Sequence, residues 1–389
     1  MMKTQLKAAT KSVKFSFNRL RKSIIVFCDV SVDTDDAIAL GVLAAKQGYN
    51  LIIVCNGSDP DQKARYAQGL MNSFAIRGLD ISHITVLAGS DCNVTEHSLP
   101  HQFNNLAFQM ADVPTLSWEE TIHEVLLNSQ PKSVSILGIG PMTDLCNTLF
   151  QFSSLVKVVV EQVVLMCDVA NIESSLVKDW GIPMFDNANN GTFDPKATAA
   201  MYGDLFSSRY YCRTTIVSKW AAGACKVGYD YYSKLGELSN QSPLAVTLAD
   251  KQQAGLKHLF YRASSTDQAI RGSLPPSFTT GLFNKIFCGG KLPEYILQNP
   301  DSDPIGWLIE NDLVDVVRFQ LYDAIAALAL LSWLEDRNLY GKMFTPIEAN
   351  DSLHVIGFNA QETGVQSPSL IIDKIKEYAL NSMNGVNIM

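Results

Sequence analysis

The sequence lacks most of the patterns that mark common catalytic and binding classes. Its eight cysteines form no CxxC pair and its six histidines no HExxH pair, which argues against a zinc site. It has no P-loop, no serine or cysteine nucleophile motif and no nucleic-acid-binding signature. It also has no run of about 18 apolar residues, so no membrane span is expected.

The length and composition instead suit a large globular fold with a sizeable hydrophobic core. The chain has 389 residues, 47% of them hydrophobic, without a long linker or low-complexity tract. Its net charge of −8 argues against binding to nucleic-acid backbones, so a small-molecule partner is expected. The unpaired cysteines suit a reducing compartment, which favours a cytoplasmic location.

Residues 1–22 differ from the remainder because they are basic and contain no acid before Asp29. This arm is typical of an organelle-targeting segment, of a surface-binding segment or of a solvated extension, and the sequence leaves the three open. Residues 23–389 are expected to form one domain, interrupted by an insertion of helices and loops at about 229–300.

Apolar runs of strand character alternate with helical patterns along this domain. Residues 24–29, 51–58 and 83–89 are three such runs, and segments with helical spacing follow the first two. This alternation predicts an α/β fold: a Rossmann-like, mostly parallel sheet with helices on both faces.

Four carboxylates gather where the first strand gives way to a helix. Asp29, Asp33, Asp35 and Asp36 fall within eight residues. One such acid can be a helix cap, but four like charges repel one another unless a cation or hydrogen-bond donors compensate. Calcium suits this chemistry, since it takes about 6–8 oxygen ligands and accepts bidentate carboxylates.

Three motifs resemble those of the nucleoside hydrolases, calcium-dependent enzymes that cut N-ribosidic bonds. The segment DTDDAIAL at 33–40 is similar to the end of the family's DxDxxxDD signature, and GPMTDL at 140–145 resembles its GPLTN motif. The pair Tyr322-Asp323 stands where the family has His-Asp at the start of a late helix. Without a gap, Ser31 matches the family's catalytic Asp; with two extra loop residues, Asp29 matches it, and this second alignment keeps the strand register.

The resemblance implies a calcium ion bound by Asp29, Asp36, Asp323 and the backbone carbonyl of Ile139. A water on the metal would attack the anomeric carbon, with Asp29 as the base and Asp33 in reserve. Asp35 would bind a ribose hydroxyl. Tyr322, a weaker acid than histidine, would assist departure of the base.

The resemblance also implies substrate contacts, several of which are altered. Asn56 precedes Gly57, the reverse of the family's Gly-Asn pair, and Asn190 matches a ribose-binding Asn. Ala188 and Ile182 replace two other contacts, for which Asn187 is a possible substitute.

Two functions follow from this resemblance. The first is hydrolysis of the N-glycosidic bond of a ribonucleoside or related N-riboside, as in purine and pyrimidine salvage. The second is a catalytically inactive ribose- or nucleotide-binding pseudoenzyme on the same scaffold. A metal-assisted hydrolase acting on another substrate is a third possibility. Family members are commonly homodimers or homotetramers, so a homo-oligomer is also implied.

Overall fold

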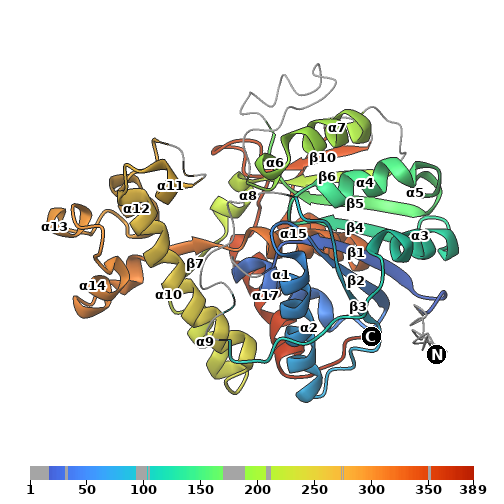
Figure 1. Cartoon of the computed structure of the whole chain (residues 1–389), viewed down its shortest axis with the longest axis horizontal. Coiled ribbons are helices and arrows are strands. Elements are labelled where there is room, and N and C mark those ends of the chain that lie inside the picture. Colours follow the sequence, from blue (N-terminus) through green and yellow to red (C-terminus); the bar gives the residue numbers. More distant parts are fainter. Residues whose placement is uncertain are drawn as a thin grey trace, which may run out of the picture.

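The computed structural model describes residues 17–30, 34–92, 103, 106–169, 189–206, 212–272, 274, 276–348 and 352–389. Its centre is an eight-stranded sheet in the order β3-β2-β1-β4-β5-β6-β10-β9 (Figure 1). The strands are β1 (Lys22–Cys28), β2 (Tyr49–Cys55), β3 (Ile84–Ala88), β4 (Val134–Gly138), β5 (Val160–Met166), β6 (Arg213–Val217), β9 (Ile347–Glu348) and β10 (Leu353–Ile356). All neighbours pair in parallel except β9, which runs antiparallel to β10.

Successive side chains of β1 point alternately into two hydrophobic cores, one on each face of the sheet. Ile24 and Val26 join one core with α1 (Thr34–Ala44), α2 (Pro60–Ile76), α15 (Tyr322–Glu335) and α17 (Pro368–Met383). Ile25 and Phe27 join the other with α3 (Trp118–Asn128), α4 (Thr143–Gln151), α5 (Ser153–Val159) and α7 (Pro195–Phe206). Successive strand residues point to opposite faces, so a strand that is apolar throughout must be covered on both. The predicted α/β architecture is confirmed.

Helices α1 and α15 are buried around almost their whole circumference. Ten of the eleven residues of α1 are buried, and α15 is buried from Asp323 to Ser332. Their small residues let these helices lie close together, and the Ser382 hydroxyl of α17 donates to the Gly41 carbonyl at 2.6 Å. Both begin with acidic residues, which helix N-termini favour.

A helical lobe follows β6; its first part packs on the main core, and from the second half of the long helix α10 (Pro243–Ser264) onward it has a core of its own. It contains α9 (Tyr231–Leu238), α10, α11 (Gln268–Arg271), α12 (Thr280–Phe287), α13 (Glu294–Leu297) and α14 (Pro304–Glu310). Its interior is formed by residues such as Phe260, Phe283 and Leu308. Figure 1 shows α11 to α14 on the left, away from the sheet. The insertion boundary at about 229–300 stays a prediction.

Shorter elements complete the described chain. They are α6 (Asn189–Phe193), α8 (Lys219–Ala224), α16 (Arg337–Met343), a 3-10 turn at Val314–Val316, and the antiparallel pair β7 (Lys226–Gly228) and β8 (Arg318–Gln320). Among the described helices, none combines the length and apolarity that crossing a membrane requires.

Candidate functional site

Three acids meet where α1 and α15 begin. Asp35, Asp36 and Asp323 each offer a carboxylate oxygen, and these oxygens all lie within 4.8 Å of one another. The three residues are only 7%, 3% and 5% exposed. The backbone N–H of Asp323 donates to Oδ2 of Asp35 at 3.3 Å, which links the two helix starts directly. The structure thus brings together acids that are 288 residues apart in sequence.

This donor set fits a hard divalent cation. Three buried carboxylates repel one another strongly, and the partial positive charge at two helix N-termini offsets only part of that repulsion. Carboxylate oxygens are the ligands that calcium prefers, and bidentate binding lets three of them fill much of its coordination shell. The cluster lies outside the carboxyl end of β1, at the edge where open α/β sheets bind ligands.

Asp29 lies at the same edge but is not in this group, and its nearest described cation is a lysine. Lys63 in α2 is 0% exposed, and its Nζ lies 3.9 Å from Oδ2 of Asp29. The same ammonium donates to the Asn56 carbonyl at 3.2 Å. A buried ammonium needs a counter-charge, and Asp29 supplies it. The proposed roles of Asp29 as metal ligand and base stay predictions.

Sequence reasoning missed Lys63, although the sequence contained a signal for it. Lys63 occupies a helical position in line with the buried residues Ala67, Leu70 and Phe74 of α2. A lysine on the apolar face of a helix must be buried with a partner or extend out of the core. The loop before α2 also makes room for it, because a side chain at Gly57 would place a Cβ 2.9 Å from the Lys63 Nζ.

The turn after β4 packs directly against the end of β1. A Cβ at Gly140 would lie 2.8 Å from the backbone nitrogen of Asp29, so only glycine allows this close approach. Ile139 donates its N–H to the Phe27 carbonyl at 2.8 Å, which fixes the turn beside the strand end. The assignment of the Ile139 carbonyl to a metal stays a prediction.

The predicted substrate-binding asparagines make internal bonds. Asn56 is fully buried and its Nδ2 donates to the Pro141 carbonyl at 2.9 Å. Asn190 in α6 is half-buried and donates to the Met166 carbonyl at 3.1 Å. Each amide therefore supports the loops of the site from within. Their contacts with a substrate stay predictions.

Tyr322 is the first residue of α15 and is half-buried next to Asp323. This position places its side chain at the same helix start as the acidic cluster, while its role in leaving-group departure stays a prediction. Three residues from the sequence argument, Ser31, Asp33 and Asn187, lie outside the described residues, as do Ile182 and Ala188.

The helical lobe reaches the cluster through Thr34, the residue before Asp35. The Tyr232 hydroxyl of α9 donates to Oγ1 of Thr34 at 2.8 Å. The Thr34 hydroxyl in turn donates to Oε1 of Gln252 in α10 at 3.1 Å. The lobe therefore borders the acids on one side. Within the lobe, Phe283 is fully buried and packs against Phe260 and Phe287.

A further acid was also missed. Asp144, in the first turn of α4, is fully buried, and burial raises the pKa of its carboxyl. The Ser90 N–H donates to Oδ2 of Asp144 at 2.9 Å, and this hydrogen bond lowers the pKa of the carboxyl. This bond ties the loop after β3 to α4, which gives Asp144 a structural role at the same edge of the sheet.

Comparison with known proteins identifies the fold. No protein-family model matches the chain, and no curated protein matches it in sequence. Among solved structures, it resembles the type III effector protein XopQ complexed with adenosine diphosphate ribose, at 20% identity and a TM-score of 0.68, over 95% of each chain.

Two enzymes are also similar in structure. A purine-preferring ribonucleoside hydrolase from Gardnerella vaginalis is 13% identical, with a TM-score of 0.57 over 93% of this chain and 99% of that one. The inosine-uridine preferring nucleoside hydrolase from Bacillus anthracis is 13% identical, with a TM-score of 0.50 over 94% and 100%. At these identities the likeness shows the fold, and it confirms the fold that the three sequence motifs implied.

Proposed function

We propose, from the premise that the chain has the nucleoside hydrolase fold, that it hydrolyses the N-glycosidic bond of a ribonucleoside or related N-riboside at a calcium site. The observation that carries this proposal is the meeting of Asp35, Asp36 and Asp323 within 4.8 Å at the ligand-binding edge of the sheet. Asp36 and Asp323 would hold the metal, joined by the Ile139 carbonyl and by Asp29. Asp35 would share the metal environment and accept a hydrogen bond from a ribose hydroxyl.

Each partner in this mechanism has a defined task. When bound, calcium would lower the pKa of a water molecule and orient it toward the anomeric carbon. Asp29 would accept the proton of that water, and the surrounding carboxylates would stabilise the positive charge that develops on the sugar. Tyr322 would donate a hydrogen bond to the departing base.

One contact favours a second candidate function, riboside binding without turnover. The Lys63 ammonium lies 3.9 Å from Oδ2 of Asp29, so an internal ion pair occupies the carboxylate that would have to accept the proton of the water. Asn56 and Asn190 also hydrogen-bond to the chain's own carbonyls. The similar effector was solved with adenosine diphosphate ribose, which supports a larger ribose-containing ligand for this alternative.

Calcium binding is the first test. Isothermal titration of the metal-free protein with calcium is expected to show one site, lost in Asp36→Asn and in Asp323→Asn. The matched control is Asp250→Asn, which changes an exposed acid of α10 in the helical lobe. Unchanged calcium affinity in both cluster variants would refute the metal site.

Turnover is the second test and separates the two functions. Release of free base from inosine, uridine or nicotinamide riboside, dependent on calcium and lost in Asp36→Asn, would support hydrolysis. Calcium-dependent binding of adenosine diphosphate ribose or of a riboside, with no product after prolonged incubation, would support the binding protein.

A further inference from the structure

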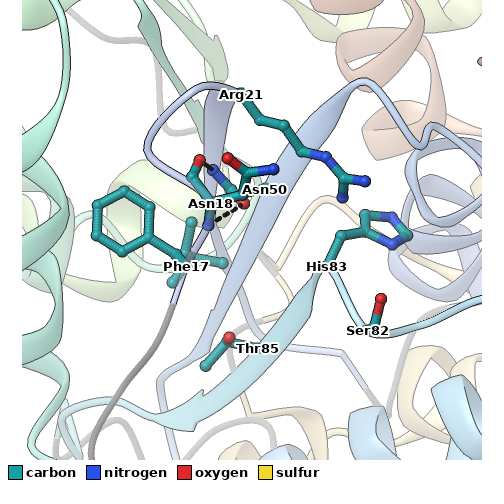
Figure 2. Close-up of a pocket in the computed structure, with 8 residues that line it drawn as sticks. Phe17, Asn18, Arg21, Asn50, Ser82, His83 and Thr85 are labelled. Carbon is teal, nitrogen blue, oxygen red and sulfur yellow. Dashed lines mark hydrogen bonds between the residues drawn. The ribbon is translucent and has the colours of Figure 1, made fainter.

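A cavity lies at the opposite edge of the sheet from the acidic cluster. Its volume is about 300 Å³, and its walls come from three segments: the turn before β1, the start of β2 and the entry to β3 (Figure 2). The seven residues of β1 separate this edge from Asp29, which corresponds to about 20 Å of extended chain. The cavity is therefore distinct from the acidic cluster.

The turn that carries the cavity's arginine is held firmly in place. Asn50 is 3% exposed, and its Nδ2 donates to the Asn18 carbonyl at 2.8 Å. The Asn18 N–H donates in return to Oδ1 of Asn50 at 3.2 Å, and the Arg21 N–H closes the turn on the Asn18 carbonyl at 3.1 Å. This reciprocal pair fixes the segment before β1 against β2, so the cavity is a pre-formed feature.

Two nitrogen-rich side chains face each other across the cavity. Figure 2 shows the Arg21 guanidinium extending toward the His83 ring. Arg21 makes no side-chain hydrogen bond or ion pair with any residue that the structure describes. His83 is 6% exposed, and within the described part of the chain neither ring nitrogen has a hydrogen-bond partner of normal geometry. A buried ring whose nitrogens lack well-formed hydrogen bonds is a suitable place for a bound water or anion.

The charge balance at this edge favours an anion. Burial and the Arg21 charge lower the pKa of His83, while the Asp80 carboxylate and the Ala44 and Asp80 backbone carbonyls act in the other direction. Asp80 is exposed, and its Oδ1 accepts a hydrogen bond from the Ser82 N–H at 2.9 Å, so it is turned to its own loop. An anion in the cavity would compensate the Arg21 charge and could also accept a hydrogen bond from the one N–H of a neutral His83 ring.

We infer that this cavity binds a phosphate group, with the Arg21 guanidinium and the His83 ring as its donors. The planar guanidinium matches two oxygens of a phosphate at once, which a lysine at this position would not do. The Thr85 hydroxyl, on the same wall, is a further donor. A volume of about 300 Å³ is at the lower end of small-ligand pockets and leaves room beside Phe17 for a small organic group. The ligand class is a small phosphate monoester.

The inference is tested by calorimetric titration of the full chain with inorganic phosphate and with glycerol phosphate, in metal-free buffer. We expect both to bind, and Arg21→Gln and His83→Gln each to weaken binding at least tenfold. Arg21→Gln removes no side-chain hydrogen bond or ion pair among the described residues, so loss of folding is not expected to obscure the result. Arg19→Gln, an exposed arginine two residues away, is the matched control and is expected to change the affinity less than twofold.

Two more variants make the test independent of the acidic cluster. Asp36→Asn is expected to leave phosphate binding unchanged, which separates this site from the proposed calcium site. Asp80→Asn is expected to strengthen binding, because it removes the acid that lies beside both donors. No detectable binding of either phosphate compound, or equal losses in Arg21→Gln and Arg19→Gln, would overturn the inference.

Discussion

Removal of the buried lysine gives the sharpest test of the site's electrostatics. In Lys63→Met a hydrophobic side chain of similar length replaces the ammonium that lies 3.9 Å from Oδ2 of Asp29. Two unit charges at this distance attract by about 4 kcal/mol at an effective dielectric constant of about 20. Because the Asp29 side chain is only 13% exposed, the solvent screens this attraction little. We expect the free energy of unfolding, measured in calcium-free urea titrations, to fall by about 3 kcal/mol.

The same substitution is expected to increase calcium affinity. Without the ammonium, the Asp29 carboxylate gains from any cation bound near it, so calcium should bind at least tenfold more tightly, equivalent to about 1.4 kcal/mol. Calcium should then restore part of the lost stability. Titration calorimetry and urea unfolding with and without calcium measure both effects.

A surface lysine supplies the control. Lys257 also forms an ion pair, with Asp303 at 3.7 Å, but its side chain is 53% exposed. Exposed pairs contribute less than about 1 kcal/mol, so Lys257→Met should leave stability and calcium affinity almost unchanged. The reasoning is refuted if Lys63→Met is as stable as the parent and binds calcium with the same affinity.

Three further predictions follow from the geometry. In metal-free buffer Asp323→Asn should raise the melting temperature by removing repulsion within the acidic cluster, and it should abolish stabilisation by calcium; calorimetric melting with and without calcium checks both. Gly140→Ala should cost about 1–3 kcal/mol in urea unfolding, because its Cβ would meet backbone at 2.8 Å, whereas Gly203→Ala in α7, with nothing within 4 Å, should be neutral or stabilising. Burial lowers the pKa of His354 to about 4, so between pH 6.5 and 4 the unfolded chain binds a proton that the folded chain excludes. Unfolding free energy should therefore fall by about 3 kcal/mol as the pH drops through this window, and His354→Gln should flatten the fall.

The sequence patterns predicted the sheet, and the resemblance to the nucleoside hydrolases implied that early acids meet Asp323. The structure groups Asp35 and Asp36 with Asp323, while Asp29 lies outside this group. These features depend on strong local patterns: a buried apolar strand, acids at its end, and an acid at the start of the apolar helix that begins at Tyr322. The acids after the first strand follow its carboxyl end, which is the edge of a parallel sheet where ligands bind. Lys63 was missed because its meaning depends on which face of α2 is buried.

Other features could not be derived from local pattern. The amides of Asn56 and Asn190 are polar residues in the expected loops, yet whether they face a ligand or a carbonyl is decided by packing across the sheet edge. The cavity between Arg21 and His83 depends on register between β1, β2 and β3, and each segment contributes only isolated polar residues to it. No sequence motif marks such a site.

The link between Asp35 and Asp323 has a consequence for biosynthesis. A ribosome releases α1 long before it has translated residue 323, so a nascent chain carries Asp35 and Asp36 without their third carboxylate. Fragments that end before α15 should therefore bind calcium weakly. A calcium ion at this cluster would stabilise only a nearly complete polypeptide, once α15 has packed beside α1.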